Sequence, residues 1–440
     1  MNTSTSRISA AKFGGGILRE QNGLTVSQSY QRAANLSREF GYGLVVVSAV
    51  NGVTNKLIKA CDLALKKSSN GASYKNEFEK VKSLHESIHD SPGVTFLHNK
   101  LYSALGNAYN GRVSPEESSA IIQSFGEQIS AQIFSEISGF ELIEPAHIGL
   151  VSSSESFLNA TVSITNGSCP DPHYQYIMGG YYARDSNGKI HLTGRGGSDY
   201  IAAMASAAMG AQSLDLWKDV DGIMTADPRI VSNTHLREEV GFHEASVLAN
   251  YGMNILHALA PEAVRGRGIS FNVRNFYAPE ATGTRIVENK TQNGFTIAHK
   301  KDISLIDVSA IEMANMYGYA SEVFSRMSQN SISVDIISTS QISISFTVSR
   351  SNGPQAHQIL SQSGIGTTSI IEDASLMTIV ADNMNFVNLS SNTFAAISSA
   401  GQSNVHAISK GSYLGELNIV LNEDLLQPVL QSVHDRLLAV

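Results

Sequence analysis

One stretch of the sequence joins a glycine turn to an alanine-rich run: Thr193-Gly-Arg-Gly-Gly-Ser-Asp-Tyr-Ile-Ala-Ala-Met-Ala-Ser-Ala-Ala-Met-Gly210. Ser198 is a favoured N-cap residue, so the run predicts a helix that begins near Asp199. The free N–H groups at such a helix start carry a partial positive charge that suits an anion. Arg195 adds a guanidinium group that matches a carboxylate or a phosphate. The stretch therefore indicates an anion site, or else an ordinary turn whose arginine is solvated.

The chain around this stretch alternates between strand patterns and helical patterns. Residues 43–48 are a continuous apolar run, which is typical of a strand buried on both faces of a parallel sheet. Residues 70–137 are expected to be mostly helical and polar, as an insertion that lies over the sheet. The other expected strands and helices cover residues 8–13, 25–40, 55–65, 141–143, 176–178, 190–192, 214–218, 242–267 and 271–274. This alternation predicts an α/β layered domain over residues 1–290.

From about residue 290 the chain becomes rich in serine, isoleucine and valine, with short alternating strands. The order strand, helix, strand, strand, helix occurs twice in this part. It predicts two small ferredoxin-like domains over residues 303–372 and 373–440, either consecutive or interleaved. Such domains hold small ligands between them, or they only dimerise.

The composition narrows the class of protein. The 440 residues suffice for two or three domains, and 42 % hydrophobic with 16 % charged residues is typical of a globular enzyme or binding protein. A net charge of −8 without a basic block argues against nucleic acid as a partner. Cys61 and Cys169 have no metal or redox spacing, which favours a reducing compartment. No stretch resembles a signal peptide or a membrane span, so we expect a cytoplasmic location.

Several polar residues follow the expected strands, where ligands of open α/β sheets bind. Lys12 comes just before Gly14 and Gly15, so its ammonium group either stabilises phosphates held by the glycine loop or is solvated. The Gly-Lys-Ser/Thr order of a P-loop is missing. Ser48 and Thr54 offer hydroxyl groups beyond the second strand, or they serve the turn there. Further candidates for ligand contacts, each with a surface role as the alternative, are Glu127, Asp219, Asp227 and Arg229.

A competing hypothesis comes from His85-Glu86-Ser-Ile-His89, which matches the H-E-x-x-H pattern of zinc proteases. On a helix, His85 and His89 could share one zinc ion, with Glu86 as the base. No third ligand is evident in the sequence, and the surrounding helix is very polar. We therefore expect no metal site of this kind.

Together these motifs resemble those of the aspartokinases in the amino-acid-kinase superfamily, most closely the lysine-sensitive monofunctional type. The resemblance runs from about residue 8 to residue 440. It rests on Lys12-Phe-Gly-Gly15, Ser48-Ala-Val-Asn-Gly-Val-Thr-Asn55, Gly194-Arg-Gly-Gly-Ser-Asp199, Asp219-Val-Asp-Gly-Ile223, Thr225-Ala-Asp-Pro-Arg229, Gly252-Met-Asn-Ile-Leu-His257 and Ser333-Val-Asp-Ile-Ile-Ser-Thr-Ser340. It implies the three-layer α/β sandwich of the amino-acid kinases, followed by tandem ACT domains of the ferredoxin-like βαββαβ type.

The resemblance implies phosphoryl transfer from MgATP to the side-chain carboxylate of L-aspartate, the opening step of lysine-, threonine- and methionine-type biosynthesis. ATP and Mg²⁺ would be the cofactors, and Lys12 and Asp199 would be catalytic. The residues implied in aspartate binding are Ser48, Thr54, Glu127, Tyr181, Arg195 and Ser198. Those implied in ATP binding are Lys12, Gly14, Gly15, Lys218, Asp219, Met224, Asp227, Arg229 and Asn254.

The resemblance also implies regulation and assembly. An amino-acid effector site would be formed by Met313, Gly318, Tyr319, Ala320, Ser333, Val334, Asp335, Thr339 and Ser340. Lysine, another amino acid and no effector at all stay open. The paired ACT domains imply a homodimer, and no nucleic-acid or membrane partner is implied.

Several positions depart from the family pattern. Gly16 and Ile17 replace a Thr-Ser pair, and Asn254 replaces a lysine that reaches the nucleotide phosphates. A neutral amide cannot balance the charge that develops in phosphoryl transfer, and such losses typically cost about 10²–10³ in rate. Lys218 stands where the family has Thr or Ser, and it offers a substitute charge. Three functions stay open: an aspartate kinase, a kinase of another amino-acid carboxylate, and an amino-acid sensor without turnover.

Overall fold

The computed structural model describes residues 8–67, 71–165, 167, 171, 173–194, 196–253, 255–291, 293–315, 317–381, 384–401, 404–411 and 415–439. The chain divides into two compact units. The first unit comprises the described residues of Met1–Ile223, Glu238–Ser246 and Ile255–Lys290. The second comprises those of Met224–Arg237, Val247–Asn254 and Thr291–Val440. Each unit is therefore assembled from segments that are far apart in the sequence.

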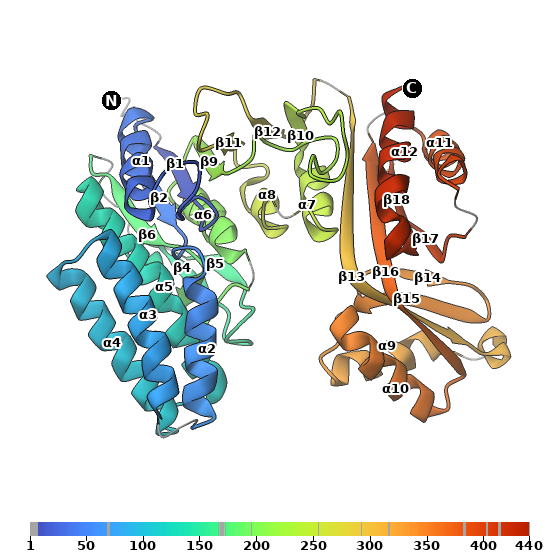
Figure 1. The fold of residues 1–440 in the computed structure, drawn as a ribbon, viewed down its shortest axis with the longest axis horizontal. Helices are drawn as coiled ribbons and strands as arrows, with labels where there is room; N and C mark the ends of the chain where they lie inside the picture. The colour runs from blue at the N-terminus through green and yellow to red at the C-terminus, as the bar shows by residue number, and fades with distance from the viewer. Residues whose placement is uncertain are drawn as a thin grey trace. The chain divides into compact units, whose positions relative to one another are not determined.

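Helices and strands are numbered in the order in which they follow one another along the chain, and Figure 1 labels most of them. The α-helices are α1 (Val26–Glu39), α2 (Val53–Leu65), α3 (Ala72–Ile88), α4 (Pro92–Tyr109), α5 (Pro115–Ser138), α6 (Gly197–Ala208), α7 (Phe242–Asn250), α8 (Leu259–Val264), α9 (Tyr319–Gln329), α10 (Gly353–Ser363), α11 (Phe386–Ser399) and α12 (Leu426–Leu438). The strands are β1 (Ser9–Phe13), β2 (Leu44–Val47), β3 (Glu141–Leu142), β4 (Leu150–Ser152), β5 (Val162–Ile164), β6 (Tyr176–Gly179), β7 (Tyr182–Arg184), β8 (Ile190–Leu192), β9 (Ser213–Lys218), β10 (Glu239–Gly241), β11 (Ser270–Asn275), β12 (Thr284–Val287), β13 (Phe295–Ser309), β14 (Ile337–Thr339), β15 (Ser343–Ser349), β16 (Thr367–Ala381), β17 (Ala407–Lys410) and β18 (Glu416–Asn422).

An eight-stranded sheet forms the centre of the first unit, in the order β10-β12-β11-β9-β1-β2-β6-β3. β1 lies between β2 and β9 and pairs with both in parallel, so that Lys12 is opposite Val46 on one side and Leu216 on the other. Every residue of β2 is buried, as expected for a strand that is covered on both faces. The predicted α/β layering around a largely parallel sheet is therefore confirmed.

A second sheet of the first unit has four strands in the order β5-β4-β7-β8. Of these four strands, each three residues long, the sequence predicts only β8. β7 and β8 are antiparallel, with Tyr182 opposite Leu192. Both side chains pack with Ala120 of α5, which fixes this sheet against the helices.

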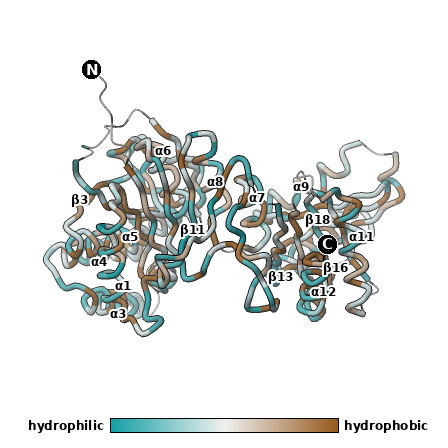
Figure 2. Tube along the Cα trace, turned by 90° about the horizontal axis from the view of Figure 1, so that it is seen from above, coloured by the Kyte–Doolittle hydropathy of each residue, from teal (hydrophilic) through white to brown (hydrophobic). Residues whose placement is uncertain are grey.

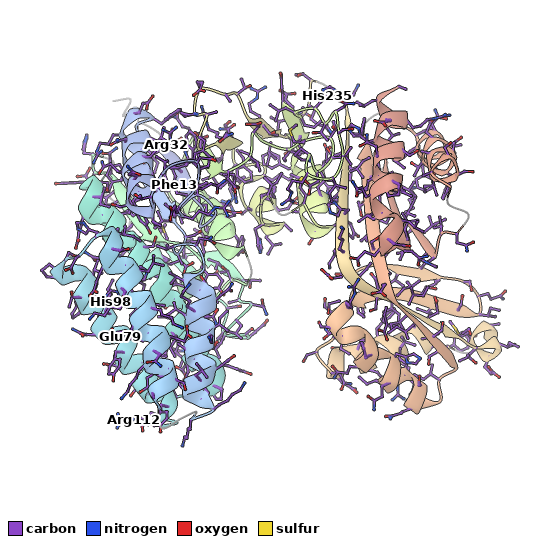
Figure 3. The ribbon with its side chains drawn as sticks, in the orientation of Figure 1. Phe13, Arg32, Glu79, His98, Arg112 and His235 are labelled. Carbon is purple, nitrogen blue, oxygen red and sulfur yellow. The ribbon has the colours of Figure 1, made fainter. Side chains whose placement is uncertain are left out.

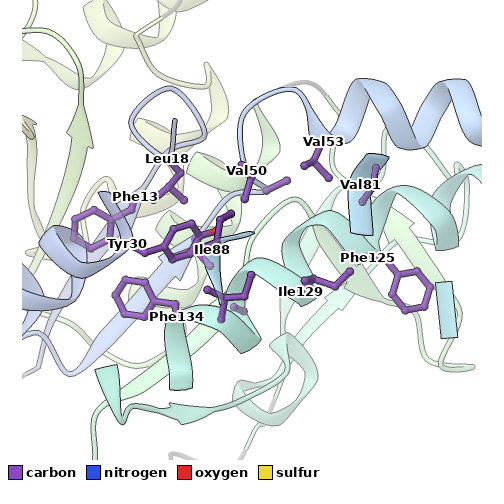
Figure 4. Packing of buried hydrophobic residues seen from close by; sticks show 14 of the residues in the cluster. Phe13, Leu18, Tyr30, Val50, Val53, Val81, Ile88, Phe125, Ile129 and Phe134 are labelled. Atoms are coloured by element: carbon purple, nitrogen blue, oxygen red, sulfur yellow. The ribbon is translucent and has the colours of Figure 1, made fainter. Parts of the chain in front are cut away.

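Helices α2, α3, α4 and α5 pack against one another in the first unit (Figure 1). The expectation of a polar insertion over residues 70–137 is wrong for α5, since Phe125, Ile129 and Phe134 belong to the main hydrophobic cluster. In Figure 4, Phe134 lies beside Phe13 of β1, and the two ring centroids are 6.0 Å apart. Burial of each such side chain stabilises the fold by about 1.5–3 kcal/mol. Helix α5 thus connects the helical layer to the sheet.

Hydrophobic and hydrophilic residues alternate along α1, α3 and α4 (Figure 2). α1 begins with a capping box, in which Thr25 Oγ1 accepts from the Gln28 N–H and Gln28 Oε1 accepts from the Thr25 N–H. It buries Tyr30 and Ala33 on one face, as an amphipathic helix does.

Within the described parts of the chain, no helix combines the length and the apolar character needed to cross a bilayer.

The second unit is built on a six-stranded antiparallel sheet in the order β14-β15-β13-β16-β18-β17. β13 and β16 are each 15 residues long, and they pair from Phe295 opposite Ala381 to Ser309 opposite Thr367. β15 pairs with the second half of β13, whereas β18 pairs with the second half of β16. The two expected ferredoxin-like segments thus share one continuous pair of strands.

Each half of this sheet has its own helices and its own core. α9 and α10 pack around Ile306 and Phe346, while α11 and α12 pack around Ile419. The repeated pattern of strands and helices is therefore present in the second unit. The division between residues 303–372 and 373–440 stays a prediction, because β13 and β16 take part in both halves.

Candidate active site

Three charged side chains meet at the carboxyl end of the central sheet of the first unit. Lys12 Nζ lies 2.7 Å from Asp199 Oδ1, and Lys218 Nζ lies 2.9 Å from Asp199 Oδ2. Lys218 also donates to Oδ1 of the same carboxylate at 3.1 Å. The side chains of Lys12 and Asp199 are 6 % and 5 % exposed, whereas that of Lys218 is 16 % exposed. Two ammonium groups against one carboxylate leave a net positive charge at a largely buried position.

The topology explains why these residues meet. Lys12 is the penultimate residue of β1, and Lys218 is the last residue of β9, its parallel neighbour. Asp199 lies in the first turn of α6, a helix that contacts both strands. Parallel strands bring their carboxyl ends to the same edge of a sheet, where ligands of open α/β sheets bind. The structure therefore brings both predicted catalytic residues together.

Helix α6 begins at Gly197, earlier than the predicted start near Asp199. Its N-cap is Gly196 and not Ser198, which is a correction to the sequence analysis. Gly196 has a φ of 78°, in the left-handed region that glycine adopts at little cost. Asp199 therefore lies inside the first turn, where its negative charge is favourable to the helix dipole as well as to the two lysines.

The backbone that follows β1 passes close to the Lys12 ammonium group. A Cβ atom on Gly14 would lie 3.1 Å from Lys12 Nζ, so glycine leaves room there that a side chain would take. Gly14 O accepts hydrogen bonds from the N–H groups of Ile17 and Leu18, which makes a tight turn that includes Gly15. Bare backbone next to a buried cation is an arrangement suited to a phosphate group.

Burial and charge together set the protonation of the Lys12–Asp199 pair. Burial lowers the pKa of Lys12 to about 8; Asp199 opposes this shift, and Lys218 adds to it. Burial alone would raise the pKa of Asp199, but the charges of Lys12 and Lys218 outweigh burial and hold that pKa below its ordinary value. The pair is therefore ionised at neutral pH.

Glu127 of α5 is a buried carboxyl group near this cluster. Its Oε1 accepts a hydrogen bond from the Ala49 N–H at 3.1 Å, while Oε2 has no hydrogen-bond partner among the described residues. Burial raises the pKa of Glu127 to about 8, although the Ala49 N–H and the charge of Lys12 work against it. A buried oxygen without a partner costs free energy, which a donor group of a ligand would recover.

Ser48 and Thr54 lie beyond the carboxyl end of β2. The Ser48 N–H donates to Phe13 O at 3.0 Å, so Ser48 lies beside the end of β1. Ser48 O in turn accepts from Ser130 Oγ of α5 at 2.6 Å. Thr54 is half-buried in the first turn of α2. Ser48 thus belongs to the same edge of the sheet as Lys12.

Tyr181 and Ser198 lie near α5 and α6. Tyr181 has a φ of 69°, which is uncommon for a residue with a side chain, and its hydroxyl donates to Gln123 Oε1 at 3.0 Å. Ser198 lies directly against the backbone of Gly180, where an added Cβ would come within 2.6 Å of the Ser198 Cβ. Strained backbone of this kind is often found at ligand sites.

Asp219 follows Lys218 and pairs with Arg19, a residue that the sequence analysis does not single out. Arg19 Nη2 lies 3.0 Å from Asp219 Oδ2, and both side chains are about one third exposed. A Cβ atom on Gly16 would lie 3.8 Å from the Asp219 carboxylate, so this ion pair borders the glycine turn. No motif predicts the role of Arg19, because its partner is distant in the sequence.

Three of the predicted nucleotide-binding residues, Met224, Asp227 and Arg229, belong to the second unit. Arg229 Nη2 lies 2.7 Å from Asp227 Oδ2, and the Arg229 side chain is 86 % exposed. Two further predicted residues, Arg195 and Asn254, lie outside the described residues. The part that these five residues play in ligand binding stays a prediction.

The H-E-x-x-H pattern does not present its two histidines to one ion. α3 ends at Ile88, and His89 has an extended backbone beyond the helix. His85 Nδ1 lies 3.2 Å from His98 Nε2, whereas His89 Nε2 lies 2.8 Å from Glu136 Oε2. In the described part of the chain, no group of three or more His, Cys, Asp or Glu side chains is placed to hold a metal ion.

The predicted effector residues lie in the second unit, and they do not all face one cavity. Tyr319 lines a cavity of about 800 Å³, whereas residues 333–335 line another of about 390 Å³. Asp335 Oδ2 lies 2.6 Å from Lys300 Nζ. Met313 and Tyr319 pack against the same hydrophobic cluster. The effector site as a whole stays a prediction.

The sequence matches the amino acid kinase family over residues 8–275 and an ACT domain over residues 306–363. The chain belongs to the amino acid kinase family. Its first unit has the α/β fold of that family, and its second unit has the ACT fold.

Known relatives refine this assignment. The chain is 25 % identical to aspartokinase 2, chloroplastic, of Arabidopsis thaliana over 96 % of this chain and 83 % of that protein. It is 37 % identical to lysine-sensitive aspartokinase 3 of Escherichia coli over 176 residues, 39 % of each protein. The predicted resemblance to aspartokinases is therefore confirmed.

Solved structures agree on the fold. The chain superimposes on E. coli aspartokinase III in complex with aspartate and ADP with a TM-score of 0.81, at 22 % identity over 98 % of this chain and 100 % of that chain. It superimposes on Clostridium acetobutylicum aspartate kinase with a TM-score of 0.72, at 20 % identity over 98 % of this chain and 100 % of that chain. These matches extend over both units of the chain.

Proposed function

We propose that this chain is an ATP-dependent aspartate kinase, which transfers the terminal phosphoryl group of MgATP to the side-chain carboxylate of L-aspartate. The observation that carries the proposal is the buried cluster of Lys12, Asp199 and Lys218 beside the glycine turn of an amino acid kinase fold. Phosphoryl transfer needs positioning and charge neutralisation rather than a covalent intermediate on the enzyme. A cluster with surplus positive charge at the sheet edge meets that need.

The reaction forms one bond and breaks another at phosphorus. A carboxylate oxygen of aspartate bonds to the γ-phosphorus of ATP, while the bond to the bridging oxygen breaks and ADP leaves with the electron pair. Lys12, oriented by Asp199, places a fixed positive charge beside the transferring group. One such preorganised group typically stabilises a transition state by about 2.7–4 kcal/mol. The product, 4-phospho-L-aspartate, is an acyl phosphate that opens lysine-, threonine- and methionine-type biosynthesis.

Glu127 is the group that we assign to the ammonium of L-aspartate. Its Oε2 lacks a partner among the described residues, and an ammonium group there would favour the ionised form of the carboxyl. Ser48, Thr54 and Tyr181 supply hydroxyl groups for the rest of the amino acid. The remaining residues of the proposed aspartate site are Arg195 and Ser198, for the α-carboxylate.

Mg²⁺ is the proposed metal cofactor, and when bound with ATP it neutralises charge on the β- and γ-phosphates. Mg²⁺ usually keeps several waters and takes only one or two carboxylates besides phosphate oxygens. Asp219 fits this demand, since its carboxylate is 33 % exposed and borders the glycine turn. Asp219 would therefore hold the ion, with Arg19 as its partner in the absence of ligand.

Trapping with hydroxylamine tests the proposal, because an aspartyl phosphate reacts to a hydroxamate. The purified full chain is expected to release ADP and form hydroxamate only when L-aspartate, ATP and Mg²⁺ are all present. A panel of other amino-acid carboxylates in the same assay distinguishes a kinase of different specificity. Absence of hydroxamate at high enzyme concentration, with calorimetry that detects an amino acid but no ATP, would favour a sensor instead.

We also propose that the second unit binds an amino-acid effector and mediates a homodimer. The ACT match supports this role, as do the exposed apolar side chains Ile311, Ile337 and Ile342 on the half that contains α9. E. coli aspartokinase III, similar in fold, has been solved in complex with lysine and aspartate. Titration of L-lysine and other amino acids in the hydroxamate assay tests regulation, and light scattering tests the dimer.

A cytoplasmic location likewise stays a prediction.

A further inference from the structure

We propose that Lys218 is a second phosphate-binding cation, which contacts the terminal phosphates of the nucleotide together with Lys12. The inference rests on the proposed kinase function and deepens it, because it assigns a specific ligand group to a lysine at the end of β9. It is carried by the geometry of the charged cluster.

The charges of the cluster do not balance. Lys12 alone would neutralise Asp199, yet Lys218 donates to both oxygens of the same carboxylate, at 3.1 and 2.9 Å. One positive charge is therefore in surplus. A surplus charge at a position removed from water is unfavourable unless an anion binds there. The cluster is consequently better suited to a state in which a phosphate group is present than to the ligand-free state.

The neighbouring acidic groups do not remove this surplus. Asp219, next to Lys218 in the chain, has its own cation in Arg19 at 3.0 Å. Glu127 is a buried carboxyl group whose pKa burial raises to about 8, so it contributes little negative charge at neutral pH. The surplus charge of the two lysines therefore stays available for a ligand.

Exposure places Lys218 on the outer side of the cluster. Its side chain is 16 % exposed, against 6 % for Lys12 and 5 % for Asp199. An entering ligand would therefore reach the Lys218 ammonium group before that of Lys12. A lysine ammonium group is a mobile point charge with three donors, so it can exchange an oxygen of Asp199 for one of phosphate.

The glycine turn lies at the same edge of the sheet as the two ammonium groups. Phe13 and Trp217 are opposite one another in the β1–β9 pair, so Gly14 and Lys218 follow side by side. A Cβ on Gly14 would lie 3.1 Å from Lys12 Nζ and 4.0 Å from Trp217 O. Both ammonium groups and the glycine turn thus converge on one place, as an anion with several oxygens requires.

Calorimetric titration of MgADP into the purified full chain tests the inference. Lys218→Met removes the charge but keeps a long side chain, and it is expected to weaken MgADP binding roughly 10- to 100-fold. Lys218→Arg keeps the charge and should retain most of the affinity. The matched control is Lys189→Met, which breaks a surface pair with Glu117 at 3.3 Å and should leave MgADP binding unchanged.

Steady-state kinetics separate ligand binding from a merely structural role. Lys218→Met is expected to raise KM for ATP more than it lowers kcat, and to leave KM for L-aspartate nearly unchanged. Because the charge of Lys218 helps to lower the pKa of Lys12, the alkaline limb of the pH profile should also move to higher pH. If Lys218→Met does not fold, Lys218→Gln takes its place in the same measurements.

The outcomes distinguish this inference from the proposed function. If Lys218→Met binds MgADP as the wild type does, or if Lys218→Arg loses as much affinity as Lys218→Met while folded, the inference is overturned. If the wild type forms no aspartyl hydroxamate but its MgADP affinity depends on Lys218, the choice of aspartate is wrong and the cation is confirmed. A wild-type chain that binds no MgADP would overturn both.

Discussion

Lys12 Nζ lies 2.7 Å from Asp199 Oδ1, and both side chains are buried. The contact joins the end of the first strand to the first turn of α6, so it links two structural layers as well as two charges. Removal of one partner from a buried ion pair typically costs about 3–5 kcal/mol, because the other charge is left without compensation. Here Lys218 also contacts Asp199, which softens the loss of Lys12.

Lys12→Met removes the inner cation and leaves Asp199 paired with Lys218. We expect kcat to fall by about 10²–10³, since a fixed charge beside the transferring phosphoryl group is lost. The hydroxamate assay measures the effect, and the melting temperature serves as the control for folding. A folded variant that keeps kcat within about tenfold of the wild type would contradict the catalytic role.

Activity should decline at alkaline pH with a midpoint near 8. Burial lowers the pKa of Lys12 to about 8, so the ammonium charge is present below that pH and lost above it. Among the described residues, the other titratable groups that face Lys12 or its partner Asp199 are Glu127, Lys218 and His257. The pH profile of kcat/KM for ATP measures the limb. Lys12→Arg should move it to higher pH, and an unchanged limb in that variant would assign it to another group.

Asn254→Lys should raise activity most where Lys218 is absent. The resemblance to aspartokinases implies a lysine at position 254, and we propose that the charge of Lys218 compensates for its absence here. We expect a gain of roughly tenfold in kcat/KM for ATP in a Lys218→Thr background, and a smaller gain in the wild type. Equal gains in both backgrounds would mean that the two positions act independently.

The stability of the first unit should fall in acid because of a buried histidine pair. His85 Nδ1 lies 3.2 Å from His98 Nε2, with the two rings stacked at 5.4 Å. Figure 3 labels His98 among the helices of this unit. Burial lowers the pKa of His85 to about 3 from its ordinary value of 6.5, and it lowers the pKa of His98 in the same direction.

The sign of this effect follows from proton uptake. The unfolded chain binds protons below about pH 6.5 while the folded chain does not, so stability is complete above that pH and declines below it. Each histidine costs up to about 1.4 kcal/mol per pH unit in this range. Melting temperatures recorded against pH measure the decline, and His98→Leu should make it shallower. An equally steep decline in that variant would point to other groups.

Local sequence signals were sufficient for the parts of the site that depend on neighbouring residues. The apolar run of β2, the lysine near the end of β1 and the glycine turn all lie where the sequence predicts them. The Arg19–Asp219 pair could not be predicted, because it depends on how the turn after β1 folds back toward β9. The start of α6 was misplaced, since Ser198 is a good cap by type but Gly196 can adopt the positive φ that this turn requires.

Strand length was the other limit. Only short strands were expected beyond residue 290, whereas β13 and β16 are 15 residues long each. The end of a strand depends on pairing with the neighbouring strand, which local sequence does not reveal. β13 and β16 pair with each other from one end to the other, and both are therefore long. A polar character was likewise expected around Phe125 and Phe134, although α5 contributes both to the core.

The shared strands β13 and β16 restrict how this protein can be re-engineered. Either half of the six-stranded sheet, expressed by itself, would still contain both β13 and β16 at full length. One of these two strands would then lack its neighbour and become an exposed edge strand, and exposed edge strands promote aggregation. Chimaeras that exchange ligand preference with a homologue must therefore graft the whole sheet, or alter individual side chains within it. For the same reason, the two halves of this sheet cannot accumulate substitutions in β13 and β16 independently of each other.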